Sequence, residues 1–129
     1  MARSDERRFR VPFFVTMTGL SDFTMQTASA ALDGLSLRAK VRADNIANAE
    51  TPGYRARRVD FESALRAAGG DITGVEFTER DANTAVDIRG NSVDLEAEVT
   101  ELVQDNLMFQ AMVNGFNYKA NLLRTAMGS

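Results

Sequence analysis

The chain of 129 residues contains no cysteine, no histidine, no tryptophan and only two prolines. Without cysteine it can form no disulfide, no thiolate metal site and no cysteine nucleophile. Without histidine it lacks the commonest general base and, with cysteine also missing, the usual ligands of transition metals. The sequence therefore predicts no catalytic residue, no metal site and no cofactor.

Long apolar runs are also missing near the start of the chain. The apolar run Val11 to Val15 is far too short for the core of a signal peptide or for a membrane span. A protein of this kind that works outside the cytoplasm would need another export route. The net charge of −3 gives no bulk attraction to nucleic acid or anionic lipid, and the length suits one domain.

The sequence disfavours three classes of function. Catalysis is disfavoured because the serines have no histidine to activate them and no glycine-rich phosphate loop occurs. Nucleic-acid binding has one candidate, the basic cluster Arg55 to Arg58 beside Tyr54, which could contact phosphate. Asp60 and Glu62 dilute that cluster, so we favour a solvated turn or ion pairing between subunits. A membrane-surface helix is disfavoured because the C-terminal helix is acidic. Neither nucleic acid nor a small-molecule substrate is expected.

Residues 1–16 form a basic extension with four arginines before the apolar cluster Phe13-Phe14-Val15. Two interpretations stay open: a disordered tail, or an arm that docks on a neighbour through Phe9, Phe13 and Phe14. We expect residues 17–50 and 91–129 to form a discontinuous helical core, and residues 51–90 to form a connector.

The first long helix is predicted from Ser21 to Ala49, with Ser21 or Asp22 as N-cap. Gly34 inside it costs about 1 kcal/mol against alanine, or marks a close approach by another backbone. Residues at alternating steps of three and four give a narrow coiled-coil-like seam, in which only Arg42 breaks the apolar pattern. The seam consists of Met25, Ala28, Leu32, Leu35, Ala39, Arg42, Ile46 and Ala49.

This helix is predicted to stop at a tight turn. Thr51 precedes a proline and is biased away from the helical region. Pro52 and Gly53 suit the two central positions of a type II turn, the second of which needs a positive φ. The expected turn residues are Asn45, Asn48, Thr51, Pro52, Gly53 and Tyr54.

The connector from Tyr54 to Gly90 is rich in glycine and aspartate. Phe61 to Ala68 predicts a short helical turn, and alternation at Val75–Phe77 and Val86–Ile88 allows short strands. Because a long structureless connector argues against compactness, we expect this stretch to become ordered only against other chains.

The second long helix is predicted from Asn91 to Met127, capped by Asn91 or Ser92, with acidic residues in its first turns. Asn106, the one polar member of its seam, either specifies register or points to a wet edge. A second apolar face needs more than one partner, so the helix lies in a bundle or meets neighbouring subunits. The seam is Leu95, Leu102, Phe109, Phe116 and Leu123 with Val99, Asn106, Val113, Ala120 and Met127, and the second face is Val103, Leu107, Met108, Met112 and Leu122.

Charge favours an antiparallel arrangement of the two helices. The late part of the first helix carries Arg38, Lys40 and Arg42, and the early part of the second carries Asp94, Glu96, Glu98 and Glu101. Surface pairs are worth only about 0–1 kcal/mol each, so they would set direction more than stability. The alternative is that both patches are solvated. The predicted fold is mainly α: two long terminal helices packed antiparallel as a coiled-coil-like pair, joined by an irregular connector with possible short β pieces.

Two stretches of sequence resemble the bacterial flagellar axial proteins, which include rod, hook and hook-associated proteins. The first is NIANAETPGYRARRVDFESAL and the second is NSVDLEAEVTELVQDNLMFQAMVNGFNYKANLLRTAM. Within that family the chain is most similar to the B type of rod protein. The C type is the nearest alternative, but its middle segment, rich in proline and aspartate, is not visible between Tyr54 and Gly90.

The resemblance implies a structural subunit of the proximal rod of the bacterial flagellar basal body, self-assembling through its terminal helices to transmit torque. It implies export through the flagellar type III export apparatus without a cleaved signal peptide, and a place in the rod in the periplasmic space. Implied partners are other rod proteins of the C, F and G types, the rod-base adaptor protein and the MS ring. No residue is expected to be catalytic. The turn would present the connector to neighbours, and the helix-packing interface would be Leu32, Leu35, Ile46, Leu95, Leu102, Asn106, Phe109, Val113, Phe116 and Leu123.

Overall fold

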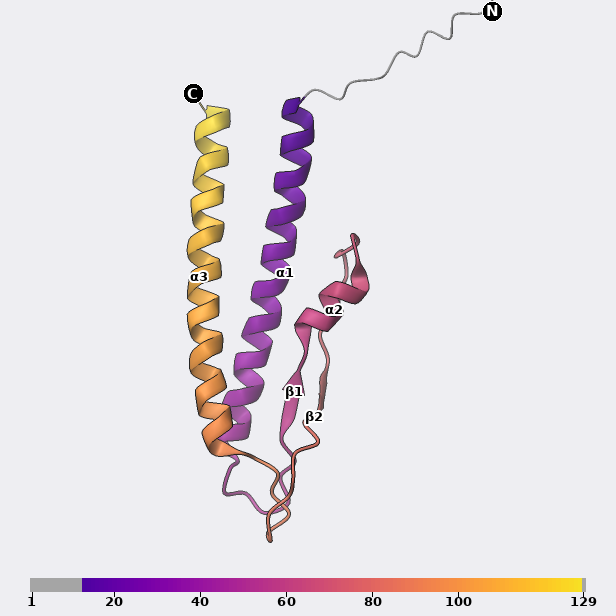
Figure 1. The fold of residues 1–129 in the computed structure, drawn as a ribbon, viewed down its shortest axis with the longest axis vertical. Helices are drawn as coiled ribbons and strands as arrows, with labels where there is room; N and C mark the ends of the chain where they lie inside the picture. The colour runs from indigo at the N-terminus through magenta and orange to yellow at the C-terminus, as the bar shows by residue number, and fades with distance from the viewer. Residues whose placement is uncertain (1–12, 129) are drawn as a thin grey trace, which may run out of the picture.

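The computed structural model describes residues 13–128, with side chains from Asp22 onward. Two long helices, α1 (Phe13–Ala47) and α3 (Leu95–Gly128), stand side by side, and a connector with two short strands and one short helix lies against α1 (Figure 1). Both described ends of the chain lie at the same end of the molecule. The antiparallel pair of terminal helices is therefore confirmed. The two interpretations of the N-terminal extension lie outside the described residues, apart from the helical backbone that begins at Phe13.

Helix α1 is longer than the sequence pattern predicts. It runs for 35 residues without a break, so Ser21 and Asp22 lie inside it and do not cap it. Helix α1 fits between the two prolines of the chain, Pro12 and Pro52, and the single Gly19 between Phe13 and Ser21 costs only about 1 kcal/mol. Ser21 and Asp22 thus do not act as N-caps, because the residues before them are already helical.

Helix α3 begins later than expected, at Leu95. The Asp94 carboxylate caps it by accepting a hydrogen bond of 3.1 Å from the backbone N–H of Ala97. Glu96 and Glu98 occupy the first turn, as predicted from the helix dipole. Asn91 and Ser92, expected as caps, are buried before the helix and make other contacts that are described below.

The connector folds back onto α1. Strands β1 (Arg57–Val59) and β2 (Glu79–Asp81) pair antiparallel, and helix α2 (Phe61–Ala68) follows β1. Helix α2 matches the predicted range, and Asp60 caps it by accepting from the Ser63 N–H at 3.1 Å. The strands expected at Val75–Phe77 and Val86–Ile88 do not form, because the actual strands are charged segments that pair with each other instead of alternating over a core.

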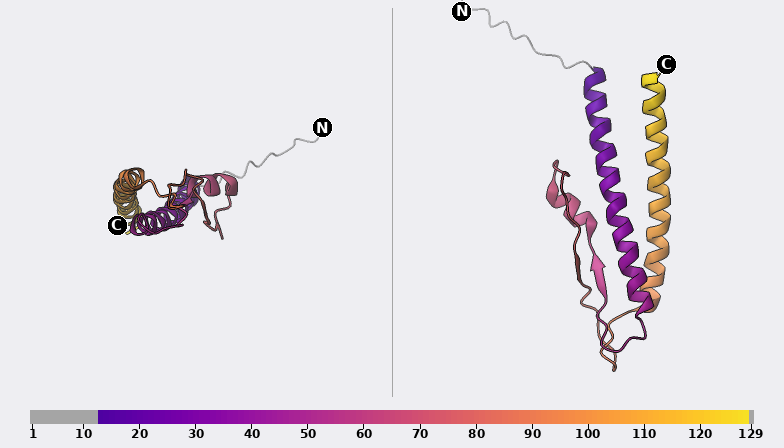
Figure 2. Two further views of the ribbon diagram at one scale, coloured as in Figure 1. Left: turned by 90° about the horizontal axis from the view of Figure 1, so that it is seen from below. Right: turned by 180° about the vertical axis from the view of Figure 1, so that it is seen from behind.

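The apolar core lies mainly between α1 and the connector. Its buried members come from α1, β1 and α2, and the partly buried side chains of Phe109 and Met112 in α3 pack against them. Figure 2 shows α3 and the connector on different sides of α1. Helix α1 is therefore the shared element, with α3 on one side and β1 and α2 on another. The expectation that the connector becomes ordered only against other chains is wrong, because in the single chain its residues Val59 and Phe61 are buried against α1. The buried apolar cluster is Ala31, Leu35, Val41, Val59 and Phe61.

Gly34 explains how α2 comes so close to α1. A Cβ atom at this position would lie 2.5 Å from the Cβ and 2.6 Å from the Cγ of Phe61. The close approach allowed by Gly34 is thus to a side chain of the connector. Because the nearest atom is a Cβ, no rotamer change of Phe61 can relieve the clash.

Gly34→Ala should therefore destabilise the protein by about 1–3 kcal/mol, although alanine is the better helix former. Gly115→Ala is the matched control, since a Cβ at Gly115 meets nothing within 4 Å in the single chain. This second substitution should stabilise the monomer by up to about 1 kcal/mol. Urea unfolding of the two variants measures both effects, and a stabilising Gly34→Ala would contradict the packing of α2 on α1.

Candidate functional site

The turn after α1 is built as the sequence predicts. Gly53 has a φ of 75°, and the N–H of Tyr54 donates to the carbonyl of Thr51 at 3.3 Å, which closes a turn over Pro52 and Gly53. The N–H of Thr51 donates to the carbonyl of Asn48 at 3.0 Å, so the turn continues directly from the helix end. The chain is thereby reversed within a few residues, which positions β1 beside α1.

Asn45 is the fully buried centre of this region, with an exposed fraction of 0%. Its amide group donates to the carbonyl of Arg57 at 2.8 Å and to the carboxylate of Glu98 at 3.0 Å. Its oxygen accepts from the Arg57 N–H at 3.0 Å and from the Tyr54 hydroxyl at 3.1 Å. One side chain thus joins α1, β1, the turn and α3, and all its hydrogen-bonding groups are satisfied.

Asn91 and Ser92 close the same region from the other side. The Asn91 amide donates to the carbonyls of Asn48 at 2.9 Å and Thr51 at 2.7 Å. The hydroxyl of Ser92 accepts from the buried N–H of Ala56 at 2.7 Å. The sequence does not reveal either role, because the same two residues also suit a helix cap.

Charged side chains bridge the two long helices just above the turn. Arg38 donates to both oxygens of Asp105, at 3.0 and 2.6 Å, and to both oxygens of Glu62, at 2.8 and 3.0 Å. Its guanidinium also lies 4.6 Å from the centre of the Phe61 ring. Arg38 therefore links α3 to the connector through α1.

Arg42 extends this network along α3. It donates to Asp105 at 2.8 Å and pairs with Glu98 at 3.4 Å and with Glu101. The Asp105 side chain is only 6% exposed, so this is a buried carboxylate held by two guanidiniums. Burial lowers the pKa of Arg38, but the hydrogen bonds and charges of Asp105 and Glu62 outweigh it, and the pKa is raised.

These contacts differ from the surface pairs that the sequence pattern predicts. Arg42 does pair with Glu98 and Glu101, as antiparallel packing requires, whereas Lys40 is exposed. The side chains of Arg42 and Glu98 are 17% and 12% exposed. The range of about 0–1 kcal/mol for an exposed ion pair is therefore too small for this largely buried pair. Removing one partner of a buried pair typically costs about 3–5 kcal/mol, because the other charge is left uncompensated.

The same charges rotate the closed end of α3 away from the predicted seam. Glu98 and Asp105 face α1, while their neighbours Val99 and Asn106 are exposed. The predicted seam is wrong within one chain at Leu95, Val99, Asn106 and Met127, because all four are exposed. Near the turn, α3 faces α1 with carboxylates instead. Of the other predicted packing residues, Leu35 is buried, and the half-buried ones are Leu32, Ile46, Leu102, Phe109, Val113, Phe116 and Leu123.

The basic cluster beside Tyr54 is paired within the chain. Arg57 contacts Glu79 at 3.1 Å and Arg55 contacts Asp81 at 3.5 Å, across the two strands. These ion pairs neutralise part of the positive charge that would attract a phosphate group. Both pairs lie within one chain, whereas the sequence favours a solvated turn or pairing between subunits.

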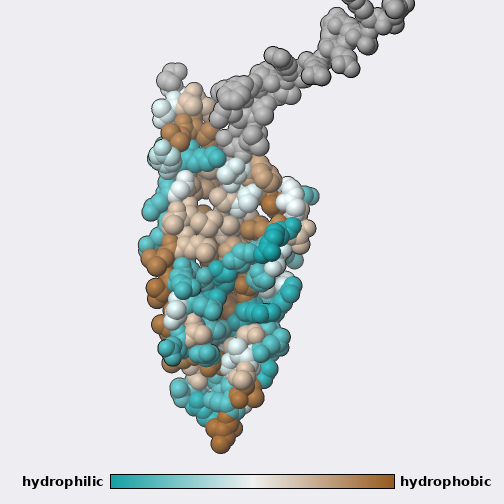
Figure 3. Space-filling view, viewed as in Figure 1, coloured by the Kyte–Doolittle hydropathy of each residue, from teal (hydrophilic) through white to brown (hydrophobic). Residues whose placement is uncertain are grey.

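The outward surface of α3 carries large hydrophobic side chains among polar ones. Large hydrophobic side chains that α1 does not cover are 44–68% exposed. In Figure 3 brown side chains follow the edge of the molecule on which α3 lies. We call this set the outer stripe: Leu95, Val99, Val103, Leu107, Met108, Tyr118 and Leu122.

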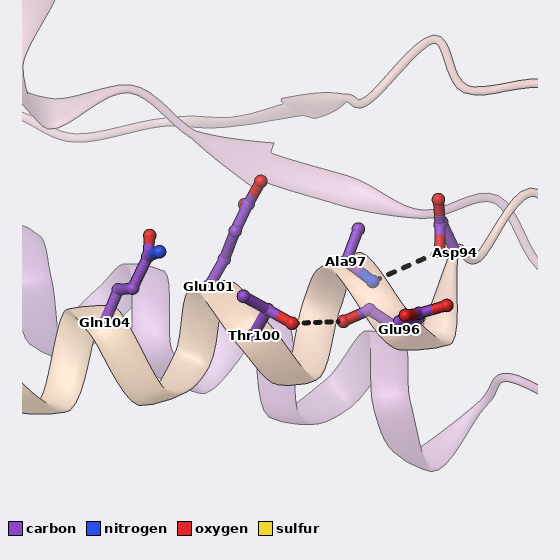
Figure 4. A pocket seen from close by; sticks show the side chains of 6 residues that line it. All are labelled: Asp94, Glu96, Ala97, Thr100, Glu101 and Gln104. Carbon is purple, nitrogen blue, oxygen red and sulfur yellow. Dashed lines mark hydrogen bonds between the residues drawn. The ribbon is translucent and has the colours of Figure 1, made fainter.

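A shallow hollow lies at the start of α3 and is lined by the N-cap residue Asp94 and five residues of the helix, from Glu96 to Gln104 (Figure 4). Asp94 bonds the Ala97 N–H there and Thr100 bonds the Glu96 carbonyl, so both serve the helix itself. Within residues 13–128 no group of acidic side chains could hold a metal ion. None of the described helices is long and apolar enough to span a membrane.

Comparisons with known proteins agree with one another. A family model described as flagella basal body rod protein matches residues 25–55. The flagellar basal body rod protein FlgB of Bacillus subtilis is 35% identical over 119 residues, covering 81% of this chain and 92% of the relative. The protein of the same name from Borreliella burgdorferi is 31% identical over 107 residues, or 64% of this chain and 79% of its own. That of Escherichia coli is 28% identical over 119 residues, or 74% and 86%.

The register of α3 can be tested with two adjacent substitutions. Asp105→Asn removes the charge that both arginines share, and it should lower the free energy of unfolding by about 3 kcal/mol. Asn106→Asp changes an exposed side chain and should stay within about 0.5 kcal/mol of the unaltered protein. Urea unfolding measures both, and a larger cost at Asn106 than at Asp105 would return α3 to the register predicted from the sequence.

Alkaline pH should weaken the turn. Burial, and secondarily the Asp44 carboxylate, raise the pKa of Tyr54 above its ordinary value of 10.0. A raised folded-state pKa means that Tyr54 contributes stability that is fully present below pH 10 and lost as pH rises through the folded value. Unfolding free energies measured at increasing pH should therefore fall more steeply for the unaltered protein than for Tyr54→Phe.

Tyr118→Phe is the control for this titration, because Tyr118 is 68% exposed. This variant should keep the alkaline loss of stability that the unaltered protein shows. Identical pH dependence of the Tyr54→Phe variant and the unaltered protein would show that Tyr54 does not carry the effect. At neutral pH Tyr54→Phe should also lose about 1 kcal/mol, since the hydroxyl no longer donates to Asn45.

Proposed function

The chain belongs to the FlgB family of flagellar basal body rod proteins, and from this premise we propose that it builds the proximal part of the rod through its long helices. As a member of this family it is a structural subunit of the flagellar basal body rod. Self-assembly and the transmission of torque are consistent with that role. We propose that the protein catalyses no reaction.

The observation that carries the proposed mode of assembly is the outer stripe of α3. A monomeric protein rarely exposes a long apolar stripe, because burying a leucine or valine side chain is worth about 1.5–3 kcal/mol. Helix α1 already occupies the opposite face of α3 through its arginines and the half-buried seam. The outer stripe therefore packs against neighbouring subunits, and many repeated contacts of this kind make the rod stiff.

In this proposal the turn after α1 sets the position of the connector. Asn45, Asn48, Thr51, Pro52, Gly53 and Tyr54 fix the angle at which the connector leaves α1. The proposed helical core consists of residues 17–50 and 91–129, and residues 51–90 form a structured side piece that packs on α1. Leu95 and Asn106, exposed in the single chain, are assigned to packing between subunits.

Partners and location follow from the family. The relatives are named as basal body rod proteins, and association with other rod components follows from membership. More specifically, we propose contacts with rod proteins of the C, F and G types, with the rod-base adaptor protein and with the MS ring. We also propose passage through the flagellar type III export apparatus without a cleaved signal peptide, and a final place in the periplasmic space.

A charge in the outer stripe should block assembly without unfolding the subunit. Leu107 is 62% exposed, so Leu107→Asp should leave helix content and unfolding free energy nearly unchanged. In a strain that carries only this variant, the rod should incorporate little of the subunit, since each contact loses about 2 kcal/mol of apolar burial. Swimming in soft agar and the composition of purified basal bodies measure the effect.

The matched control is Thr78→Asp, which adds the same charge to an exposed position of the connector, away from α3. This variant should assemble and swim normally. Normal motility of the Leu107→Asp strain, with the variant present in its basal bodies, would remove the outer stripe from the assembly mechanism.

A further inference from the structure

The sequence contains a single asparagine that is followed directly by glycine, Asn114, which lies with Gly115 in the terminal half of α3. In such a pair the backbone nitrogen of the glycine can attack the side-chain carbonyl carbon of the asparagine. The missing Cβ removes a steric barrier and leaves the backbone free to adopt the conformation that the attack needs. Neither residue belongs to the apolar core, to the ion network or to the outer stripe.

The structure leaves the side chain of Asn114 free to react. Both Asn114 and Gly115 are exposed, and among the described residues the Asn114 side chain has no hydrogen-bond partner. Asn114 borders a shallow hollow on the surface of α3. A Cβ atom at Gly115 would meet nothing within 4 Å, so no neighbouring group of the single chain crowds the pair. The restraint on the reaction is therefore the backbone of the helix itself.

This restraint is weak at Asn114. In the closed helix the Gly115 N–H is bonded to the carbonyl of Ala111 and cannot approach the preceding side chain, so the reaction requires local opening. Glycine in a helix interior makes such opening roughly fivefold more frequent than alanine does. Helices α1 and α3 also diverge in this direction (Figures 1 and 2), and the neighbouring Phe116 is only half-buried. The buried Asp105 lies about two and a half helical turns away.

We propose that Asn114 is a site of spontaneous deamidation in the free subunit, and that packing of α3 against neighbouring subunits stops the reaction. The Gly115 nitrogen loses its proton and bonds to the side-chain carbonyl carbon of Asn114, while the bond from that carbon to the amide nitrogen breaks and ammonia leaves with the proton. Water then opens the cyclic imide and gives aspartate or isoaspartate. The reaction needs no reagent other than water.

The isoaspartate product would change α3 severely. It routes the main chain through the side-chain carbon, which lengthens the backbone by one methylene and breaks the register of helical hydrogen bonds. It also adds a negative charge. Helix α3 would then end near Gly115 and lose the turns that carry Phe116, Leu122 and Leu123. The protective part of the proposal rests on the proposed rod function, and on that basis the reaction marks subunits that stay unassembled for long.

Mass spectrometry of the aged full-length chain tests the reaction. The purified protein is kept in mildly alkaline buffer and digested at intervals, and fragment spectra locate the mass gain of about 1 Da that deamidation produces. Asn106 and Asn117 are internal controls, because both are exposed on α3 and are followed by Leu107 and Tyr118. The gain should appear at Asn114 and be several-fold slower at the controls. Equal rates at the three asparagines, or no gain at Asn114, would overturn the proposal.

Two substitutions separate the chemistry from the opening of the helix. Asn114→Gln keeps Gly115, but its longer side chain would have to close a larger ring, so the gain at this position should be lost. Gly115→Ala keeps Asn114, and the gain should fall by more than the roughly fivefold change in helix opening, because the new Cβ also hinders the attack. Hydrogen exchange of the α3 amides measures the opening of each variant. Unchanged deamidation in Gly115→Ala would contradict attack by the neighbouring nitrogen.

Ageing of assembled subunits tests the protection. Purified basal bodies and free subunits are kept in the same buffer, and Asn114 should gain mass several-fold more slowly in the basal bodies. Equal rates in both samples would refute protection by assembly, while the deamidation site and the rod function would stand. Absence of the unaltered chain from purified basal bodies would instead overturn the proposed function.

Discussion

The buried carboxylate of Asp105, held between Arg38 and Arg42, is the constraint on which the arrangement of the helices depends. A charge that is only 6% exposed is tolerated because two guanidiniums neutralise it in good geometry. Any rotation or sliding of α3 by one residue would remove Asp105 from both arginines and bury an unpaired charge. Apolar packing alone accepts several registers, since leucine and phenylalanine fit many neighbours. The ion network therefore selects one register from those that the seam allows.

The same network makes the connector part of the structure. Arg38 reaches Glu62 and stacks on Phe61, both in α2, while Asn45 bonds β1 and α3 at once. Helix α1 thus carries two interfaces that meet at shared side chains. Loss of one interface would leave polar groups of the other unsatisfied, which costs more than the contact itself is worth. The three segments of the chain are in this way bound into one unit.

How far the sequence predicts this structure depends on the kind of signal. Periodicity and charge order gave the two long helices and their antiparallel direction, and Pro52 with Gly53 gave the turn, because these are local or additive effects. The rotation of α3 could not be obtained, since Asp105 is an ordinary surface residue until Arg38 lies opposite to it. Gly34 predicts that another part of the chain comes close to the helix, but not that this part is Phe61. Asn91 and Ser92 have the chemistry of a helix cap. Their other role becomes visible only in the folded chain, which brings Asn91 to the end of α1 and Ser92 to the backbone of Ala56.

The packing of α1 against α3 is uneven along its length, and this has a mechanical consequence. Near the turn the pair is fastened by buried ions and by Asn45, whereas toward the termini the helices diverge (Figure 1), and the described side chains of the α3 seam there, Phe116 and Leu123, are half-buried. Local opening then costs little at the terminal end and approaches the global free energy at the other. A pull on either terminus would separate the two helices progressively from the terminal end, one helical turn after another, instead of breaking all their contacts at once.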